Sequence, residues 1–349
     1  MTMEPKLLTR SQKSVTMSPD ILRDPVLHAA WAYYVEDMSQ SEVADRLGVS
    51  RASVHNYLRQ ARLDGLVRIA IDPGIVGRSE LAQDLAEIAN VPSVYLVPDG
   101  AADATERVTT AAGMWLVDLV GRDSVLGVSW GMTVRAVAER LPRAARPTMT
   151  VVQLLGSMAN VGNTSSEACS VLIAQRLGAA CVNLHVPAVL SDPALVEALL
   201  REHAIAGQLA ALSRCDTALF STGAVDESAH VLRAMVATPD ELGHYRAEGA
   251  CAVVGGRFFD RTGAVIQGPL DGRIIGIGID DLKAIRKRIV VCPGPHRLEA
   301  LLAVLRGGFA THLITDEVTA RRALDVLRAE DRPPPQPLSN HSVAAEDGA

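Results

Sequence analysis

From Ser93 to Leu327 the chain alternates between short apolar runs and amphipathic stretches, and this alternation constrains its fold more than any other feature. The apolar runs predict buried strands at Ser93–Val97, Ser124–Val128, Thr150–Leu155, Cys181–His185, Thr217–Phe220, Ile274–Ile277, Ile289–Cys292 and His312–Ile314. The spacing of apolar residues predicts helices between many of them, at Glu106–Val120, Thr133–Leu141, Ser166–Leu177, Leu298–Arg306 and Glu317–Leu327. Strands that alternate with helices in this way predict a doubly wound α/β domain with a mostly parallel sheet.

A smaller helical region precedes this alternation. Val26–Asp37 has amphipathic spacing, with Trp31 and Val35 among its apolar residues. Ser39, with Glu42 three residues later, forms a capping-box pattern at the start of a short helix, and Gly48 is placed to end that helix. The following segment, 50–62, contains three arginines and no acid. Two helices joined by a tight glycine turn, the second one basic, are typical of a helix-turn-helix that enters the major groove of DNA.

The second of these helices carries the predicted DNA contacts on its outward side, because Val54, Leu58 and Ala61 face inward. These contacts are Ser50, Arg51, Ala52, Ser53, His55, Asn56, Arg59 and Arg62. The first side chains of the helix are expected on base edges, and the later arginines on phosphates. An ordinary three-helix domain with solvated arginines is the alternative interpretation.

The overall composition restricts the remaining possibilities. The 349 residues carry a net charge of −6, so any DNA contact has to be made by a local basic surface. No segment approaches the roughly 18 unbroken apolar residues of a membrane span, and the first twenty residues lack the apolar centre of a signal peptide. Five scattered cysteines without a Cys-x-x-Cys pair indicate buried, reduced thiols and no metal site. We therefore expect a cytoplasmic protein without a membrane segment or a cofactor.

The pattern predicts five segments along the chain. A flexible tail at 1–20 is followed by the helix-turn-helix domain at 21–72 and a linker helix at 73–92. The α/β domain occupies 93–330, and a Pro-rich, disordered tail occupies 331–349.

Polar and glycine-containing loops follow several predicted strands, and in doubly wound sheets ligands bind at the carboxyl ends of strands. The segment GVSWGMT at 127–133 joins a strand to a helix, whose free backbone N–H groups and positive end favour an anion or a sugar. The loops at 129–133, 156–163, 221–226 and 293–297 and the segment GGRFFDRTG at 255–263 supply the predicted ligand contacts. These are Ser129, Trp130, Gly131, Met132, Thr133, Gly156, Ser157, Asn160, Gly223, Asp260, His296 and Arg297.

Several of these segments resemble the SorC family of bacterial sugar-responsive transcriptional regulators, also described as having a sugar-binding, DeoR-like C-terminal domain. The segment WAYYVEDMSQSEVADRLGVSRASVHNYLRQARLDGLVRI resembles the family's helix-turn-helix, and GVSWGMT resembles its G-x-x-W-G-x-T loop. GGRFFDRTG is similar to its aromatic segment, and 275–324 to its C-terminal signature. The resemblance implies an effector domain of the sugar-phosphate isomerase/deaminase type without catalytic residues, in a dimer or tetramer. It also implies that a sugar, polyol or sugar-phosphate effector changes the affinity for operator DNA.

Three departures from the family pattern affect the expected ligand chemistry. Asn163–Glu167 contains no lysine, whereas some relatives carry one that forms a Schiff base, so non-covalent binding is expected. Arg297 stands where phosphate-binding relatives commonly carry a lysine, which keeps the charge and adds a planar fork of donors. Val253 stands where relatives often have an acid, which removes one expected contact to a sugar hydroxyl.

Two alternative functions remain open at this point. An isomerase- or deaminase-like enzyme fused to a DNA-binding arm would need a carboxylate or histidine base. The candidates are Asp226, Glu227, Asp260, His296 and Asp316, each of which also fits a helix cap, a turn or a solvated loop. The other alternative is an architectural DNA-binding protein whose large domain only oligomerises. Turnover of a sugar phosphate would identify the enzyme, and stabilisation by a sugar ligand would exclude the architectural protein.

Overall fold

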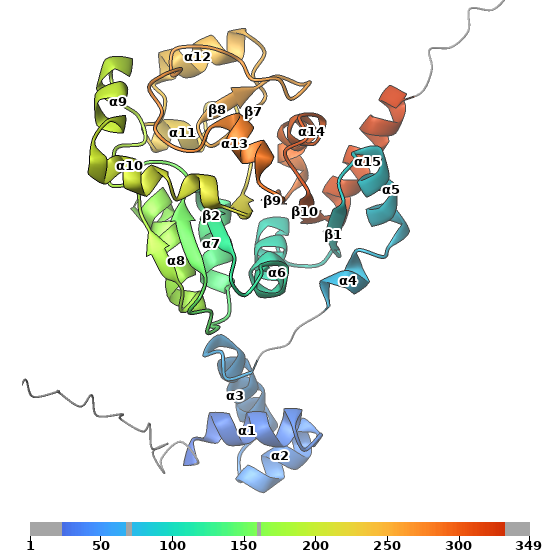
Figure 1. Cartoon of the computed structure of the whole chain (residues 1–349). Helices are drawn as coiled ribbons and strands as arrows, with labels where there is room; N and C mark the ends of the chain where they lie inside the picture. Colours follow the sequence, from blue (N-terminus) through green and yellow to red (C-terminus); the bar gives the residue numbers. More distant parts are fainter. Residues whose placement is uncertain (1–22, 68–71, 159–161, 332–349) are drawn as a thin grey trace, which may run out of the picture. The chain divides into compact units, whose positions relative to one another are not determined.

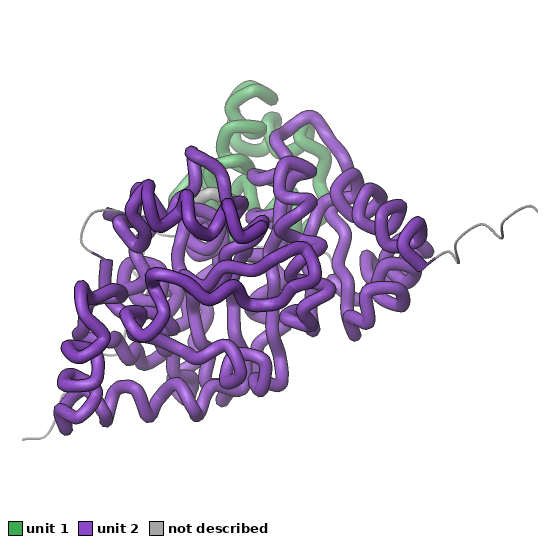
Figure 2. Tube along the Cα trace, turned by 90° about the horizontal axis from the view of Figure 1, so that it is seen from above, with its two compact units in different colours: residues 1–69 green, residues 70–349 purple. Residues whose placement is uncertain are grey.

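The computed structural model describes residues 23–67, 72–158 and 162–331. Within them the chain forms two compact units, which belong to Met1–Ile69 and Ala70–Ala349 (Figure 2). The tails predicted at 1–20 and 331–349 lie outside the described residues, except for Asp331. Asn160 also lies outside them.

The smaller unit consists of helices α1 (Pro25–Tyr34), α2 (Gln40–Leu47) and α3 (Arg51–Leu63). The predicted capping box is present at α2, because the Ser39 hydroxyl accepts from Glu42 N and the Glu42 carboxylate accepts from Ser39 N. Gly48 ends α2 in the left-handed conformation, with φ of 67°, which glycine adopts without steric cost. The sequence therefore fixes both ends of the short helix that precedes α3.

Small side chains fill the core of this unit. It is built from Ala29, Ala30, Ala32, Val43, Ala44, Val54, Leu58 and Ala61. Trp31 and Val35 were expected on the buried face of α1, but they are 56% and 60% exposed. The alanines of α1 face the other two helices and pack closely on them. This orientation of α1 leaves positions 31 and 35, which are one helical turn apart, on the outer face.

The larger unit is built on a parallel sheet, as the alternation predicts. Its described strands are β1 (Ser93–Val97), β2 (Val125–Val128), β3 (Thr150–Gln153), β4 (Ala180–Val182), β5 (Thr217–Phe220), β9 (Lys287–Val291) and β10 (His312–Asp316). They lie in the order β1-β10-β9-β5-β2-β3-β4, and each neighbouring pair is parallel. The strand order reverses between β2 and β5, because β3 and β4 follow on one side of β2 and β5 lies on the other. Such a reversal opens a crevice for a ligand at the carboxyl ends of the strands.

Helices cover both faces of this sheet (Figure 1). On one face α6 (Ala104–Leu119), α7 (Met132–Arg140) and α8 (Ser166–Leu177) contribute to one core cluster. On the other, α5 (Glu80–Ile88), α14 (Leu298–Arg306) and α15 (Glu317–Asp331) contribute to a second. The strands alternate between the two clusters: Leu219 faces the first, and Ala218 and Phe220 face the second. This burial on both faces explains the continuous apolar runs in the sequence.

The remaining helices are short. They are α4 (Pro73–Val76), α9 (Pro193–Leu200), α10 (His203–Leu209), α11 (His230–Arg233), α12 (Pro239–Ala247) and α13 (Ile279–Ala284), with 3₁₀ turns at Gly162–Thr164, Leu212–Arg214 and Pro295–Arg297. The helix expected as a linker is α5, and it buries Ala82 and Leu85 in the core of the larger unit.

One predicted strand is wrong, and one small sheet was missed. Ile274–Ile277 makes only isolated bridges, Ile274 with Val189 and Gly276 with Leu155. A Cβ at Gly276 would lie 2.6 Å from the carbonyl oxygen of Leu154, so close backbone packing replaces a strand ladder here. The missed sheet is antiparallel, in the order β6 (Gly223–Ala224), β7 (Ala252–Val254) and β8 (Arg257–Phe259).

The described residues contain no helix that is long and apolar enough to cross a membrane. Cys169, Cys215 and Cys292 are buried as expected, and burial raises the pKa of each of these thiols to about 12. Cys251 is half-buried and Cys181 is exposed, contrary to the expectation that all five thiols are buried. Cys181 lies at the edge of the sheet in β4, which has a neighbour on one side only.

Candidate functional site

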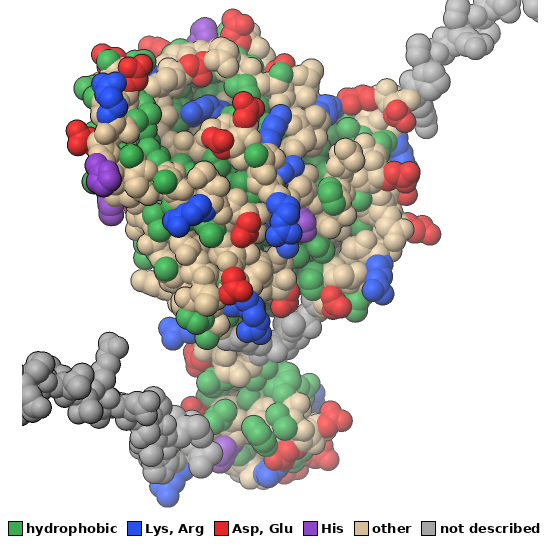
Figure 3. All heavy atoms as spheres, viewed as in Figure 1, with side chains coloured by type: hydrophobic (Ala, Val, Ile, Leu, Met, Phe, Trp, Pro, Cys, Tyr) green, Lys and Arg blue, Asp and Glu red, His purple; other side chains and the backbone are tan. Residues whose placement is uncertain are grey.

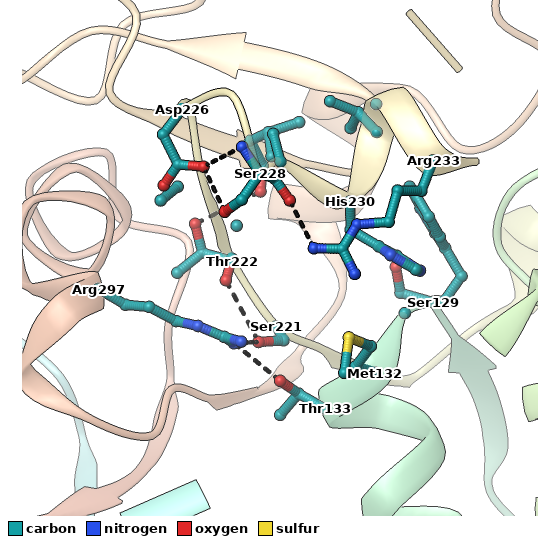
Figure 4. A pocket seen from close by; sticks show the side chains of 18 of the residues that line it. Ser129, Met132, Thr133, Ser221, Thr222, Asp226, Ser228, His230, Arg233 and Arg297 are labelled. Atoms are coloured by element: carbon teal, nitrogen blue, oxygen red, sulfur yellow. Dashed lines mark hydrogen bonds between the residues drawn. The ribbon is translucent and has the colours of Figure 1, made fainter. Parts of the chain in front are cut away.

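A cavity of about 200 Å³ lies at the carboxyl ends of β2, β5 and β9, on both sides of the reversal in strand order (Figure 4). Two-thirds of the predicted ligand contacts line it. These are Ser129, Trp130, Gly131, Met132, Thr133, Gly223, His296 and Arg297. The cavity therefore gathers loops from distant parts of the sequence, as expected for a doubly wound sheet.

The loop after β2 forms the floor of this cavity. The backbone N–H of Ser129 donates to the Leu219 carbonyl at 3.0 Å, which fixes the loop to β5. Gly131 begins α7 with φ of 104°, and a Cβ at this position would lie 3.7 Å from the His230 ring. The position therefore requires glycine for its backbone conformation and not for space. No side chain of the described residues caps α7, so its first N–H groups remain available to a ligand.

Arg297 reaches the cavity from the 3₁₀ turn that precedes α14. Its Nη1 donates to Thr133 Oγ1 at 2.8 Å and to Ser221 Oγ at 3.5 Å. Figure 4 shows the guanidinium directed between these two hydroxyls. Asp316 holds the loop that leads to Arg297, because its carboxylate accepts from Gly294 N at 2.7 Å and from Thr319 N at 2.9 Å. The buried Asp316, a candidate base in the enzyme hypothesis, thus anchors a loop.

His230 and Arg233, which the sequence did not single out, also line the cavity. The His230 ring stacks on Trp130 with centroids 5.1 Å apart, and its Nε2 lies 3.1 Å from Thr164 Oγ1. Burial lowers the pKa of His230, and the nearby charges of Arg233 and Arg297 lower it further. Both residues come from α11, a helix of four residues, which is too short to produce a periodic pattern in the sequence.

Further lining groups come from the loop after β5. Ser221, Thr222 and Asp226 lie in the segment that was expected to contain ligand contacts, although only Gly223 was predicted from it. The sequence feature that could have identified Ser221 and Thr222 as ligand contacts is the presence of hydroxyl side chains at the end of a predicted strand. Asp226 Oδ1 accepts from both the N–H and the hydroxyl of Ser228, so it closes a local turn.

Three of the predicted ligand contacts lie outside the cavity. A Cβ at Gly156 would lie 2.6 Å from the Pro187 carbonyl oxygen, so this glycine permits close backbone packing. The Ser157 hydroxyl donates to the Leu184 carbonyl at 3.1 Å. Asp260 accepts from Thr262 N at 2.8 Å and Ala264 N at 3.0 Å in the turn after β8. None of the three lines the cavity. Asn160, the fourth predicted contact from outside it, lies beyond the described residues.

In the smaller unit, α3 presents the predicted DNA contacts to solvent. Arg51, Ala52, His55, Asn56, Arg59 and Arg62 are exposed, whereas Val54, Leu58 and Ala61 are buried. The Ser50 hydroxyl caps the helix by accepting from Ser53 N at 3.1 Å, and the two hydroxyls lie 2.9 Å apart. In the described part of the chain no carboxylate pairs with the three arginines of α3. These positive charges therefore remain available for contacts with DNA.

The described residues include no group of three or more His, Cys, Asp or Glu side chains that could hold a metal ion. On the face of the larger unit shown in Figure 3, basic and acidic side chains are interspersed. Among the described lining residues of the cavity, the guanidinium groups belong to Arg233 and Arg297 and the carboxylate to Asp226. The cavity thus has an excess of positive charge.

Comparison with protein families gives two matches. The family model described as "Putative sugar-binding domain" matches residues 74–325, which is most of the chain. The model described as "Sigma-70, region 4" matches residues 31–64, the segment that includes α2 and α3. The first match covers the whole cavity, and the second covers the predicted DNA-binding helix.

Individual relatives agree with these matches. The chain is 38% identical over 306 residues to the uncharacterized transcriptional regulator YjhU of Escherichia coli strain K12, covering 85% of this chain and 93% of that protein. It is 26% identical over 306 residues to the deoxyribonucleoside regulator of Bacillus subtilis strain 168, covering 86% and 97%.

The fold also matches the crystal structure of the full-length sorbitol operon regulator SorC from Klebsiella pneumoniae. The TM-score is 0.70 at 22% identity, over 88% of this chain and 99% of that one. The named relatives are regulators, so the comparisons support the regulator and not the enzyme alternative. The chain belongs to the SorC family of transcriptional regulators with a sugar-binding domain.

Proposed function

We propose that this regulator binds operator DNA through α3 and that a sugar, polyol or sugar-phosphate effector in the cavity changes its operator affinity. The observation that carries the proposal is the position of the cavity. It lies at the reversal of strand order between β2 and β5, with a helix N-terminus, hydroxyls and a guanidinium around it. Few other places in a doubly wound domain offer these groups together.

The roles of the α3 residues follow from their positions along the helix. Arg51 and Asn56 lie in its first half and are proposed to contact base edges, as Arg does with guanine and Asn with adenine. Arg59 and Arg62 lie in its second half and are proposed to contact phosphates. Ser50, Ala52, Ser53 and His55 complete the proposed surface.

The roles of the cavity residues follow from their chemistry. The free N–H groups at the start of α7 and the Arg297 guanidinium favour an anionic group, such as a phosphate. The hydroxyls of Ser129 and Thr133 suit the hydroxyls of a sugar. Trp130 presents an apolar ring to the carbon frame, and Gly223 and His296 contribute to the walls.

We also propose that the protein acts in the cytoplasm as a homodimer or homotetramer. A single α3 covers one half-site, and two α3 helices related by symmetry would bind two half-sites with useful specificity. Static light scattering at the concentration used for DNA binding tests this point. A monomer that still binds its operator tightly would contradict it.

The effector is best tested by a thermal-shift screen of aldoses, polyols and their phosphates on the full chain, because a ligand that binds only the folded state raises its stability. At least one class of compound is expected to raise the melting temperature of the wild type. The same compound should change the affinity for an operator recovered by selection from random DNA. A stabilising compound that leaves operator affinity unchanged would contradict the proposed coupling.

A further inference from the structure

We propose that Arg233 forms a second anion-binding site in this cavity, across from Arg297, and that the effector carries an anionic group at each end. This inference rests on the proposed function and specifies the chemical class of the effector. A neutral sugar, a polyol and a sugar with one phosphate would each leave the Arg233 site empty.

The two arginines enter the cavity from different walls. Arg297 comes from the turn before α14 and contacts Thr133 and Ser221. Arg233 comes from α11, and its Nη2 donates to the Ser228 carbonyl at 2.9 Å. Figure 4 shows the two guanidinium groups directed into the cavity from opposite sides, with Ser221 and Thr222 between the walls. A ligand that contacts both has to extend across the cavity.

Within the described residues, no carboxylate forms an ion pair with either guanidinium. Asp226 also lines the cavity, but its Oδ1 accepts hydrogen bonds from the N–H and the hydroxyl of Ser228 instead of pairing with an arginine. Two arginines that do not line the cavity have carboxylate neighbours: Arg246 Nη1 lies 3.9 Å from Glu227, and Arg273 Nη1 lies 2.5 Å from Glu241. Two guanidinium groups that line one cavity with a single carboxylate, and form no ion pair with it, are a favourable arrangement for two anionic groups.

The charges of both arginines act on the imidazole of His230. Burial lowers the pKa of its imidazole, and the charges of Arg233 and Arg297 lower it further, which favours the neutral ring over a third positive charge. Its Nδ1 is buried and has no hydrogen-bond partner among the described residues. A neutral imidazole stacked on Trp130 suits a sugar hydroxyl and the carbon frame, which places the uncharged part of the effector between the two anions.

Two classes of compound carry two anionic groups in this way: sugar bisphosphates and phosphorylated sugar acids. Both carry oxyanions at opposite ends of a short polyhydroxylated chain. Each oxyanion that accepts a charge-assisted, bidentate contact from arginine gains about ten- to a hundred-fold in affinity.

The first test uses inorganic phosphate, which needs no knowledge of the sugar. Phosphate is titrated against the full chain at constant ionic strength, and the melting temperature is followed for the wild type and for variants. Arg233→Ala and Arg297→Ala should each raise the half-saturating phosphate concentration about ten-fold or more. Arg233→Lys should lie between Arg233→Ala and the wild type. Arg246→Ala, which removes a nearby charge outside the cavity, should match the wild type.

The variants that lose phosphate binding show whether the second anion site, the proposed effector site or both are wrong. If Arg297→Ala weakens phosphate binding and Arg233→Ala behaves like Arg246→Ala, the second anion site is overturned and the proposed function stands. If neither variant differs from Arg246→Ala, the anionic effector site of the proposed function is overturned as well. Losses in both Arg233→Ala and Arg297→Ala support the inference.

The second test distinguishes the two classes of compound. Fructose 1,6-bisphosphate and 6-phosphogluconate are compared with fructose 6-phosphate for their ability to displace bound phosphate. At least one of the two-anion probes should displace it at about a tenth of the concentration required of fructose 6-phosphate or less, and Arg233→Ala should remove this advantage. Equal potency of all three probes on the wild type would overturn the inference.

Discussion

Arg297 and Thr133 are 164 residues apart in the chain, and Nη1 of Arg297 donates a hydrogen bond of 2.8 Å to Thr133 Oγ1. The bond joins the loop after β9 to the first turn of α7, so it connects the two sides of the reversal in strand order. It holds a cation beside a helix N-terminus, where the positive helix end and the guanidinium act on the same anion.

Replacing Thr133 with valine tests the role of this bond. Thr133→Val keeps the shape of a buried side chain but removes the hydroxyl that accepts from Arg297. A hydrogen bond to a charged donor contributes about 1.5–3 kcal/mol, so the half-saturating phosphate concentration should rise about ten-fold or more as Arg297 loses its position. Thr148→Val, which removes an exposed hydroxyl that donates to the Arg122 carbonyl outside the cavity, is the control. Equal phosphate binding by Thr133→Val and the wild type would contradict this role.

Substitutions in α3 should separate base contacts from phosphate contacts. Arg51→Ala or Asn56→Ala should reduce the preference for operator over random DNA by about 1–3 kcal/mol, because each good bidentate contact contributes that much discrimination. Arg59→Ala or Arg62→Ala should weaken binding to both DNAs and lower its salt dependence. Fluorescence anisotropy at several salt concentrations measures both effects.

The four α3 variants need a stability control, since a partly unfolded domain would also lose DNA binding. Circular dichroism melting should therefore match the wild type, as expected for exposed residues. Unchanged operator affinity in all four well-folded variants would show that α3 is not the recognition helix.

The sequence predicted the parallel sheet and the helices that cover it because their side chains are buried in a regular pattern. β1, β5, α8 and α14 have the predicted bounds, because each begins or ends at a clear change from apolar to polar or glycine residues. Ile274–Ile277 is apolar for another reason, since it packs at the end of the sheet without forming a ladder. An apolar run alone does not distinguish these two kinds of burial.

The residues that line the cavity were predictable in the loops that follow strands of the parallel sheet. The lining residues from other segments were not predicted. Ser129–Thr133 directly follows β2, and His296–Arg297 lies in the loop and 3₁₀ turn after β9, so the topology brings them together. Gly156 and Ser157 follow β3, which lies on the far side of β2 from β5, and they pack on backbone there. His230 and Arg233 enter the site through a connection beyond β5, and no local pattern specifies how that connection returns to the sheet.

His312 should make stability depend on pH between about 6.5 and 4. Burial, followed by the charge of Lys287, lowers the pKa of His312 to about 4 from its usual 6.5. Above pH 6.5 the imidazole is neutral in both the folded and the unfolded chain. Between pH 6.5 and 4 the unfolded chain binds a proton that the folded chain does not, so the stability falls as the pH falls.

This dependence can be measured from melting temperatures at pH 7.5 and 5.5. His312→Asn should show a smaller decrease than the wild type, because it removes the group that titrates differently in the two states. His203→Asn, at an exposed position on α10, should decrease as the wild type does. A decrease in His312→Asn as large as that of the wild type would refute the assignment.

The central claim is that the cavity controls the affinity of α3 for DNA, and release of operator DNA by the effector tests it most directly. Anisotropy of a labelled operator is followed while the effector identified by thermal shift is added to the wild type, Gly131→Val, Arg297→Ala and the control Arg246→Ala. All four proteins should bind the operator equally without effector. The wild type and Arg246→Ala should change their affinity on addition, and Gly131→Val, whose backbone would have to leave its φ of 104°, should not. Arg297→Ala should need at least ten-fold more of an anionic effector. A normal response by both cavity variants would contradict the account.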